Sequence, residues 1–319
     1  MNQLKLAVLT TALAIFSSFA FSQGSLTDSK QLAAEIPIFD MHMHVYPGLT
    51  PEELENRMNR NRVQWGGGVG AVNPKVDIGL FKQHLKDRYF PTLGQPEMAA
   101  IYLKGGVGAM GNPEDPMMKR ALNTASTLFS KREAYGFGEL ILNNQNSNPN
   151  PQFRRQAQID SPVVRQMFTL AAEHGTIIQM HIEPHHKSLQ ELKILLKEFP
   201  KVPVMISHCL AVNSSPREMN ALFEEFSQVY CELSARTQTI LARRPEAQIF
   251  GYDFAKTDWL ASIEKYSGRY MVGTDVTGDY INYDEEIKQI RYGLLQRLSP
   301  ATLQKVANLN ARQLMGVRD

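Results

Sequence analysis

The sequence predicts an α/β protein, a single-domain (β/α)8 TIM barrel that follows an N-terminal signal peptide. Short β-branched or aromatic runs alternate with stretches of helical period from Glu35 onward, eight such runs are present, and no shift in composition marks a second domain. Eight parallel strands close such a barrel, which commonly occupies about 250 residues or more. We expect residues 1–20 to be the signal peptide, residues 21–34 an N-terminal extension and residues 35–319 the barrel.

The first 20 residues have the composition of a secretory signal. Lys5 is the only charge in a short polar start, the apolar run LAVLTTALAIFSSFAF follows, and small residues precede the expected cleavage after Ala20. This run is shorter than the roughly 18 to 20 residues that span a bilayer, so no stable membrane span is expected. The mature protein is expected to be periplasmic or secreted.

The charge of the chain is nearly balanced. Its formal net charge is +2, and the lysines and arginines are scattered rather than gathered in one patch. Because polyanionic partners require a basic patch, we expect a small-molecule substrate and no nucleic acid. The sequence leaves open whether the chain forms a homo-oligomer.

Two cysteines, Cys209 and Cys231, are too few for a disulfide framework. We place them on neighbouring strands, facing the surrounding helices. Two buried free thiols are the expectation, and a disulfide between them is the alternative.

The eight strands are expected where apolar and β-branched residues gather between turn signals. They are residues 37–45, 64–72, 88–94, 134–142, 176–184, 202–210, 229–235 and 270–276. Helices are best marked in the second half: segment 161–175 opens with a Ser-Pro pair and closes on a glycine, and segment 188–200 stops at a proline. The glycine-rich stretches 64–71 and 105–116 match no phosphate-binding pattern, so they predict loops or close packing.

Histidines gather where the predicted strands end. The first strand ends in DMHMH, and residues two apart on a strand face the same side, so His42 and His44 both point into the barrel. Two such imidazoles can bind one metal ion at about 2.0 to 2.1 Å. An isolated HxH pair is a weak signal, because ordinary histidines match it equally well.

The same placement recurs on later strands, which makes the signal specific. His181 closes TIIQMH, His208 closes VMISH and Asp275 follows MVGT. In a parallel barrel these strand ends meet at one rim, so the metal-competent side chains would converge there. Single core histidines or a helix-capping aspartate explain each residue alone, but a metal site explains them jointly.

At these residues the chain resembles the amidohydrolase superfamily of metal-dependent barrels. The resemblance runs from DMHMH through HIEP, ISHC and GTD to the closing NARQLMG, and it preserves the order HxH, His, His and Asp. It implies that His42, His44, His181 and Asp275 are metal ligands. It also implies that His208 is either a ligand of a second ion or a hydrogen-bond partner of the bound water or substrate.

The fourth strand contains GFGEL, which places Glu139 where TatD-type and phosphotriesterase-related branches use a glutamate to bridge two ions. Mononuclear branches, which resemble decarboxylases and lactonases, need no such group. The alternative role for Glu139 is a carboxylate that contacts substrate or forms a salt bridge. The expected cofactor is therefore one or two divalent ions, with zinc as the first choice.

The chemistry expected of this site follows from the ion, which lowers the pKa of its water toward about 7. Asp275 is expected to take a proton from that water and deliver it to the leaving group, and His208 is the second catalytic candidate. Asp40 is a candidate partner for a ligand's second ring nitrogen, with solvation on the helix side as the alternative. On the loops, His185 and Arg236 are candidates for substrate binding, Arg236 through a substrate carboxylate.

These expectations favour an exported metal-dependent hydrolase that cleaves a small ester, lactone, amide or phosphoester. The alternative within the fold is a non-oxidative metal-dependent decarboxylase. The alternative from another class is an exported metal-binding or solute-binding protein without turnover. A coordination position left open for water favours an enzyme over a binding protein.

Overall fold

The computed structural model describes residues 24–317, which form parallel strands in two sheets. The first sheet has the order β1-β2-β3 and the second the order β4-β5-β6-β7-β8-β9. The strands are β1 (Ile38–Asp40), β2 (Val63–Gly67), β3 (Tyr89–Phe90), β4 (Leu93–Gly94), β5 (Gly136–Ile141), β6 (Ile177–His181), β7 (Val204–Ile206), β8 (Val229–Glu232) and β9 (Tyr270–Met271). Within each sheet, every strand pairs with the next along the chain, as repeated βα units require.

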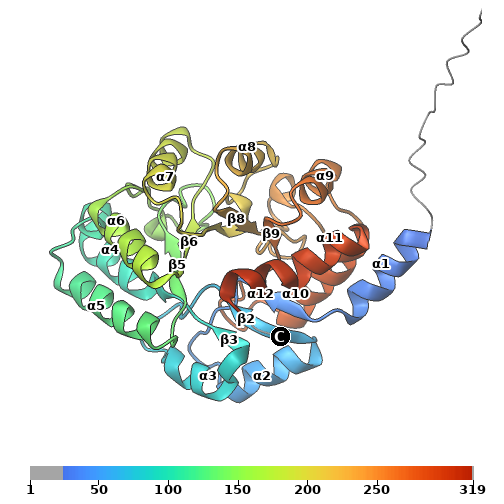
Figure 1. The fold of residues 1–319 in the computed structure, drawn as a ribbon, viewed down its shortest axis with the longest axis horizontal. Coiled ribbons are helices and arrows are strands. Elements are labelled where there is room, and N and C mark those ends of the chain that lie inside the picture. Colours follow the sequence, from blue (N-terminus) through green and yellow to red (C-terminus); the bar gives the residue numbers. More distant parts are fainter. Residues whose placement is uncertain (1–23, 318–319) are drawn as a thin grey trace, which may run out of the picture.

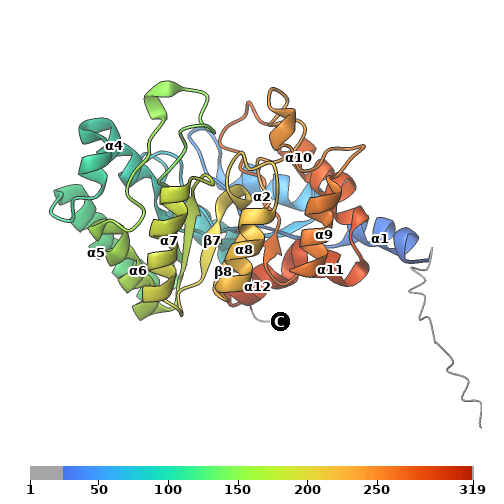
Figure 2. The same cartoon turned by 90° about the horizontal axis from the view of Figure 1, so that it is seen from above.

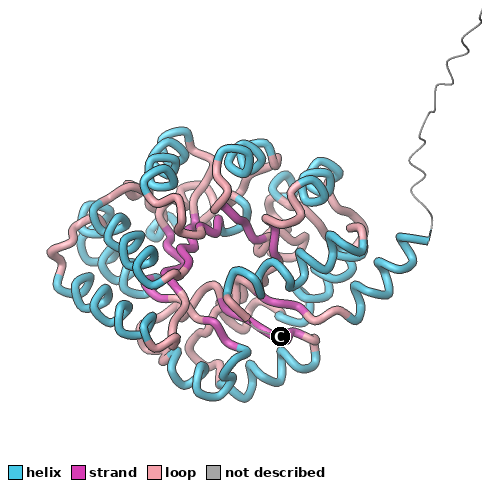
Figure 3. Tube along the Cα trace, viewed as in Figure 1, coloured by secondary structure: helices cyan, strands magenta, loops and turns pink. Residues whose placement is uncertain are grey.

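The two sheets approach each other at both of their edges. Between β3 and β4, the Thr92 hydroxyl lies 3.0 Å from the carbonyl oxygen of Gly68 and 2.7 Å from that of Gly138. On the opposite side, the Met41 amide donates to the Val272 carbonyl at 2.9 Å. The strands consequently surround a common centre, with the helices outside them (Figure 3).

Helices cover the outer faces of the sheets (Figure 1). They are α1 (Gly24–Glu35), α2 (Pro51–Arg60), α3 (Ile78–Leu85), α4 (Gln95–Met110), α5 (Pro116–Ser130), α6 (Pro162–His174), α7 (His186–Glu198), α8 (Arg217–Glu225), α9 (Thr257–Lys265), α10 (Tyr283–Gln289), α11 (Pro300–Gln304) and α12 (Asn310–Met315). In α6 the Ser161 hydroxyl accepts from the Val164 amide, and Gly175 ends the helix in the left-handed region. No helix between residues 24 and 317 is long and apolar enough to cross a membrane.

Each predicted strand overlaps an observed one, and the third divides into β3 and β4. One expected loop is wrong: residues 105–110 continue α4, with a kink at Gly106 where φ is 68°. Close packing is correct for the first glycine-rich stretch. A Cβ on Gly68, whose φ is 76°, would lie 2.2 Å from the Met41 carbonyl oxygen.

The structure describes only part of the two segments predicted at the N-terminus. The expected signal peptide, residues 1–20, lies outside the described residues. Most of the expected extension forms α1, whose Ala33 packs in the main core. The Arg291 guanidinium fastens the end of this helix by donating to the carbonyls of Ala33 and Ile36 at 2.7 and 2.9 Å.

The expectation of two free thiols is wrong, because Cys209 and Cys231 form a disulfide. Parallel pairing of β7 with β8 sets Ile206 opposite Cys231, and the turn after β7 then brings Cys209 alongside. The two Cα atoms lie 5.0 Å apart, within the range that a disulfide spans. The bond therefore joins the two strands immediately beside His208 and Glu232.

The loops that follow β5 and β8 rise at one edge of the molecule, and α12 and the C-terminus lie at the opposite edge (Figure 2). Because all strands are parallel, their carboxyl ends share the edge that bears these loops. The predicted site residues lie at that edge.

Candidate metal centre

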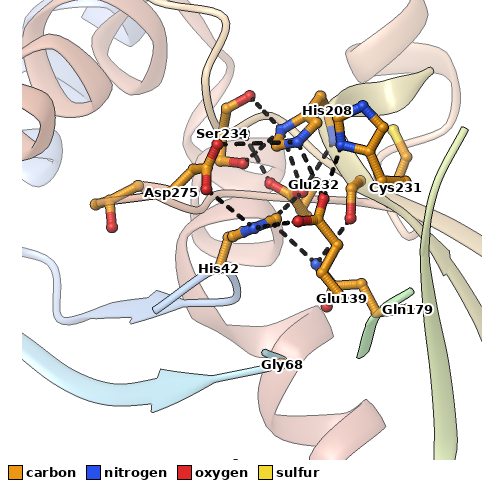
Figure 4. A network of polar contacts seen from close by, with 12 residues as sticks. His42, Gly68, Glu139, Gln179, His208, Cys231, Glu232, Ser234 and Asp275 are labelled. Carbon is orange, nitrogen blue, oxygen red and sulfur yellow. Dashed lines mark hydrogen bonds and ion pairs between the residues drawn. The ribbon is translucent and has the colours of Figure 1, made fainter. Parts of the chain in front are cut away.

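Four histidines and two carboxylates meet at the carboxyl ends of five strands. This cluster, the metal centre below, consists of His42, His44, Glu139, His181, His208 and Asp275. Five of these side chains line one cavity of about 830 Å³. His42 is fully buried and lies beneath the others. Figure 4 shows the carboxylate of Glu139 directed toward His42 and His208, with Asp275 on the other side of the imidazoles.

The first group of donor atoms belongs to His42, His44 and Asp275. The two Nε2 atoms lie 3.1 Å apart, and the Oδ1 atom of Asp275 is 3.3 Å from the first and 3.4 Å from the second. Ligand atoms about 2.1 Å from one ion, at angles of roughly 90 to 110°, are separated by about 3.0 to 3.4 Å. The three atoms therefore fit the coordination sphere of a single ion.

The second group forms around Glu139. Its Oε1 atom lies 3.0 Å from Nδ1 of His181 and 3.2 Å from Nε2 of His208. Its Oε2 atom lies 3.7 Å from Nε2 of His42. One carboxylate thus presents one oxygen to each group, which is the geometry that a bridging ligand requires.

Hydrogen bonds around the cluster occupy the outward ring nitrogens. Nδ1 of His44 lies 3.0 Å from the Gly70 carbonyl, and Nδ1 of His208 lies 2.9 Å from the Ser234 hydroxyl. Nδ1 of His42 lies 2.8 Å from the Glu232 carboxylate. Acceptors at Nδ1 hold the proton there and leave the Nε2 lone pair directed inward, as in metal-ligating histidines.

His181 has the opposite orientation. Its Nδ1 atom faces Glu139, and its Nε2 atom lies 2.9 Å from the Ser147 hydroxyl. Glu183 holds this serine in place by accepting from the amides of Asn146 and Ser147 at 2.8 and 2.6 Å. The loop after β5 therefore fixes the ring of His181 on the side away from the cluster.

The buried carboxylates and imidazoles of the metal centre shift one another's pKa values. Burial favours the neutral form of Glu139, but His42 and His181 outweigh it and hold the pKa of Glu139 well below its usual range. The pKa of Asp275 is lowered in the same way: burial raises it, but His42 and His44 outweigh this effect. Burial also opposes charge on His42, yet Glu232, Asp275 and Glu139 together raise the pKa of His42 well above its usual value. A bound cation would satisfy the same carboxylates, and buried charges require such compensation.

Arg236 holds the segment that carries His208. His208 and the two residues after it have positive φ values of 56°, 51° and 69°. The guanidinium of Arg236 donates to the carbonyls of His208, Leu210 and Ala247 at 2.7, 3.2 and 2.8 Å. These bonds stabilise a backbone conformation that L-residues rarely adopt. Arg236 does line the cavity, but most of its donors are used in this way.

Two other predicted residues lie away from the metal centre. His185 is exposed at the start of α7, where Nδ1 is 3.3 Å from the Gln156 amide nitrogen, and it does not line the cavity. Asp40 is buried, but no imidazole ring contacts it. Its carboxylate accepts from the amide and hydroxyl of Thr274 at 2.9 and 2.7 Å, so it joins the ends of β1 and β9.

Glu232 is the outer partner of His42 that sequence reasoning missed. Its Oε1 atom also accepts from the His208 amide at 2.9 Å, and Oε2 accepts from the Ser234 amide at 2.7 Å. A charged residue at the end of the otherwise apolar strand VYCE was the available signal. Burial raises and His42 lowers the pKa of Glu232, and the net effect is a lowered value.

A parallel α/β fold with imidazoles and carboxylates at its strand ends defines an enzyme of the amidohydrolase superfamily. The family model described as amidohydrolase matches residues 39–317, and the chain belongs to this family. Members typically bind divalent metal ions, in agreement with two sets of side chains here whose ligand atoms are close enough to share an ion, His42 with His44 and Asp275, and His42 with Glu139 and His208. No curated protein sequence matches the chain.

Solved structures of similar fold include enzymes of different activities. A TatD homologue from Escherichia coli has a TM-score of 0.57 and 14% identity, over 88% of this chain and 98% of that one. A probable 2-pyrone-4,6-dicarboxylic acid hydrolase from Acinetobacter baumannii has a TM-score of 0.55 and 13% identity, over 88% of this chain and 100% of that one. A 2,6-dihydroxybenzoate decarboxylase from Rhizobium has a TM-score of 0.51 and 10% identity, over 88% of this chain and 99% of that one. At these identities the likeness concerns the fold.

Proposed function

We propose that the chain is an exported hydrolase with a (β/α)8 barrel that uses two divalent ions, with zinc as the first choice. The observation that carries the proposal is the position of Glu139, whose two oxygens face different donor groups. His42, His44 and Asp275 would hold one ion, and His181 and His208 the other. The bond cleaved is that of a small ester, lactone, amide or phosphoester.

The chain's own residues divide the chemistry between them. Bound divalent ions would lower the pKa of a water molecule and polarise the scissile bond. Asp275 has 21% of its side chain exposed, and its Oδ2 atom lies 3.9 Å from Nε2 of His208. This carboxylate takes the proton of the attacking water and delivers it to the leaving group. The Oδ1 atom of Asp275 is the one that lies near His42 and His44, so Oδ2 is the oxygen left for proton transfer.

A decarboxylase of the same fold is the competing proposal, since both activities occur among the structural neighbours. Decarboxylation needs no bridging group, whereas a glutamate shared by two donor groups favours activation of water. Assays of metal-loaded protein on esters, lactones, amides and phosphoesters, beside carbon dioxide release from hydroxybenzoates, distinguish the two. Carbon dioxide release without hydrolysis would favour the decarboxylase.

The metal count is the direct test of the role of Glu139. We expect about two divalent ions per chain, and loss of at least one in Glu139→Gln, because an amide offers one oxygen ligand instead of two. Elemental analysis of the purified proteins measures this count. Glu114→Gln, which changes an exposed glutamate that pairs with Lys119, is the control and should keep both ions. One ion in the wild type and in Glu139→Gln alike would disprove the binuclear centre.

Export of the chain is supported by the buried disulfide as well as by the N-terminal composition. Disulfides persist in oxidising compartments, and the 22-residue separation of this one predicts a contribution of about 3 kcal/mol to the free energy of unfolding. Expressed from the full sequence, the protein should be recovered outside the cytoplasm, starting near Phe21 or Gln23, without free thiols. N-terminal sequencing and thiol titration check this. Full-length cytoplasmic protein with two reactive thiols would contradict export.

A further inference from the structure

Four arginines line the cavity that contains the metal centre. Arg243 is exposed, Arg154 and Arg244 are half-buried and Arg236 is buried, and the carboxylates in the lining are Glu139 and Asp275, both in the metal centre. Negative charge is therefore confined to the floor, where the ions would neutralise it. The wall above the floor has positive charge alone.

Among residues 28–317, none of these four arginines has a carboxylate oxygen within 4.0 Å. Arginines that do form such pairs lie on α2, before β3 and on α6. Arg154 donates to the carbonyls of Asn148 and Pro149, and Arg244 donates to the carbonyl of Asn146. Backbone carbonyls neutralise no charge, and each guanidinium has five N–H donors, so donors and charge remain available to a ligand.

Much of the remaining lining of this cavity is apolar. It includes Ile141, Ile240, Leu241 and Ile281, with the ring of Tyr280, 81% exposed, beside them. A volume of about 830 Å³ is in the range of cavities that enclose small organic ligands. The wall thus suits an apolar body of several carbon atoms between the reacting bond and a charged end.

We propose that the substrate has an anionic oxygen group remote from the bond that is cleaved, and that Arg154, Arg243 and Arg244 bind this group. The proposal rests on the hydrolytic function proposed above and names its substrate class. Guanidinium groups bind carboxylates and phosphates through paired, charge-assisted hydrogen bonds, so both groups have the required chemistry. Arg236 is excluded from this set because its donors hold the segment of His208.

Binding of matched probes tests the proposal without turnover. Adipate, hexanoate and 5-phosphonopentanoate share one carboxylate, have no bond that a hydrolase of this kind cleaves, and differ at the remote end, which is carboxylate, methyl or phosphonate. Calorimetry on metal-loaded protein at low salt should give a dissociation constant about tenfold lower for adipate than for hexanoate. Comparison of 5-phosphonopentanoate with adipate shows which anion the arginines prefer.

Arg243→Gln is the informative variant, because within the described part of the chain that side chain makes no hydrogen bond or ion pair for the change to break. It should lower the adipate advantage at least threefold, and Arg243→Lys should retain part of it. Arg217→Gln, an exposed arginine on α8 outside the cavity, is the matched control and should retain all of it. The proposal is overturned if adipate and hexanoate bind alike, if neither binds, or if Arg243→Gln behaves as Arg217→Gln does. Metal content and ester hydrolysis, measured on the same proteins, report separately on the proposed function.

Discussion

Replacing Asp275 with asparagine is expected to lower kcat by about 10²- to 10⁴-fold while the fold is retained. The amide has nearly the volume of the carboxylate and still offers one oxygen to an ion. It lacks the basicity needed to accept a proton from water, so the loss falls on the proton transfer. Turnover measured with excess metal, after elemental analysis has shown full occupancy, isolates this effect from loss of the ion.

The pH dependence gives a second readout of the same role. The lowered pKa of Asp275 means that its carboxylate is ionised throughout the neutral range, so it is available as a base. In the wild type, kcat/KM should rise with pH along a limb that belongs to Asp275 and the attacking water as a coupled unit. That limb should be altered in Asp275→Asn.

Asp279→Asn is the control for this variant, because Asp279 lies on the same loop but contacts Tyr46 and Arg57 at the surface. It should keep nearly wild-type turnover. The alternative role considered for Asp275, capping the following helix, has lost its basis, since Asn282 caps α10 by accepting from the amides of Asp284 and Glu285. Near-wild-type turnover in Asp275→Asn at full occupancy would remove Asp275 from the mechanism.

The strands and the converging site residues were predictable because both follow from local pattern and parallel topology. Alternation within DMHMH places His42 and His44 on one face, and parallel strands bring His181 and His208 to the same edge without further information. The presence of Glu139 in the site was also predictable, from its position near the end of a predicted strand. Such residues need only the order of the strands, not their exact packing.

The remaining features depend on contacts between segments that no local pattern reports. The disulfide requires the register of β7 against β8 and the left-handed turn at Cys209. The same turn exposes the carbonyls that occupy Arg236, which is why a loop arginine that resembled a substrate ligand holds the backbone instead. For a similar reason the role expected of Asp40, partner of a ligand's second ring nitrogen, belongs to Glu232, for which no role was predicted. Both are buried acids at strand ends, and only the arrangement of the strands in space decides which one meets His42.

Glu232→Gln is expected to weaken metal binding about 10- to 100-fold, although Glu232 belongs to neither donor group. The Glu232 carboxylate accepts from three donors, which are Nδ1 of His42 and the amides of His208 and Ser234. An amide has one accepting oxygen, so its NH2 group must face at least one of these donors and displace it. Because His42 and His208 serve different donor groups, both proposed ions should be affected.

Competition with a chromophoric chelator measures the affinity directly, and circular dichroism with thermal unfolding of the metal-free proteins reports on the fold. Glu286→Gln is the control for losing a buried carboxylate. Burial raises the pKa of Glu286 to about 7, and this side chain, which is not part of the metal centre, accepts from the Thr237 hydroxyl, so a neutral amide replaces it at little cost. Wild-type affinity in Glu232→Gln would mean that His42 is oriented by packing alone. A loss in Glu232→Gln with wild-type affinity in Glu286→Gln would instead assign the orientation of His42 to this one carboxylate.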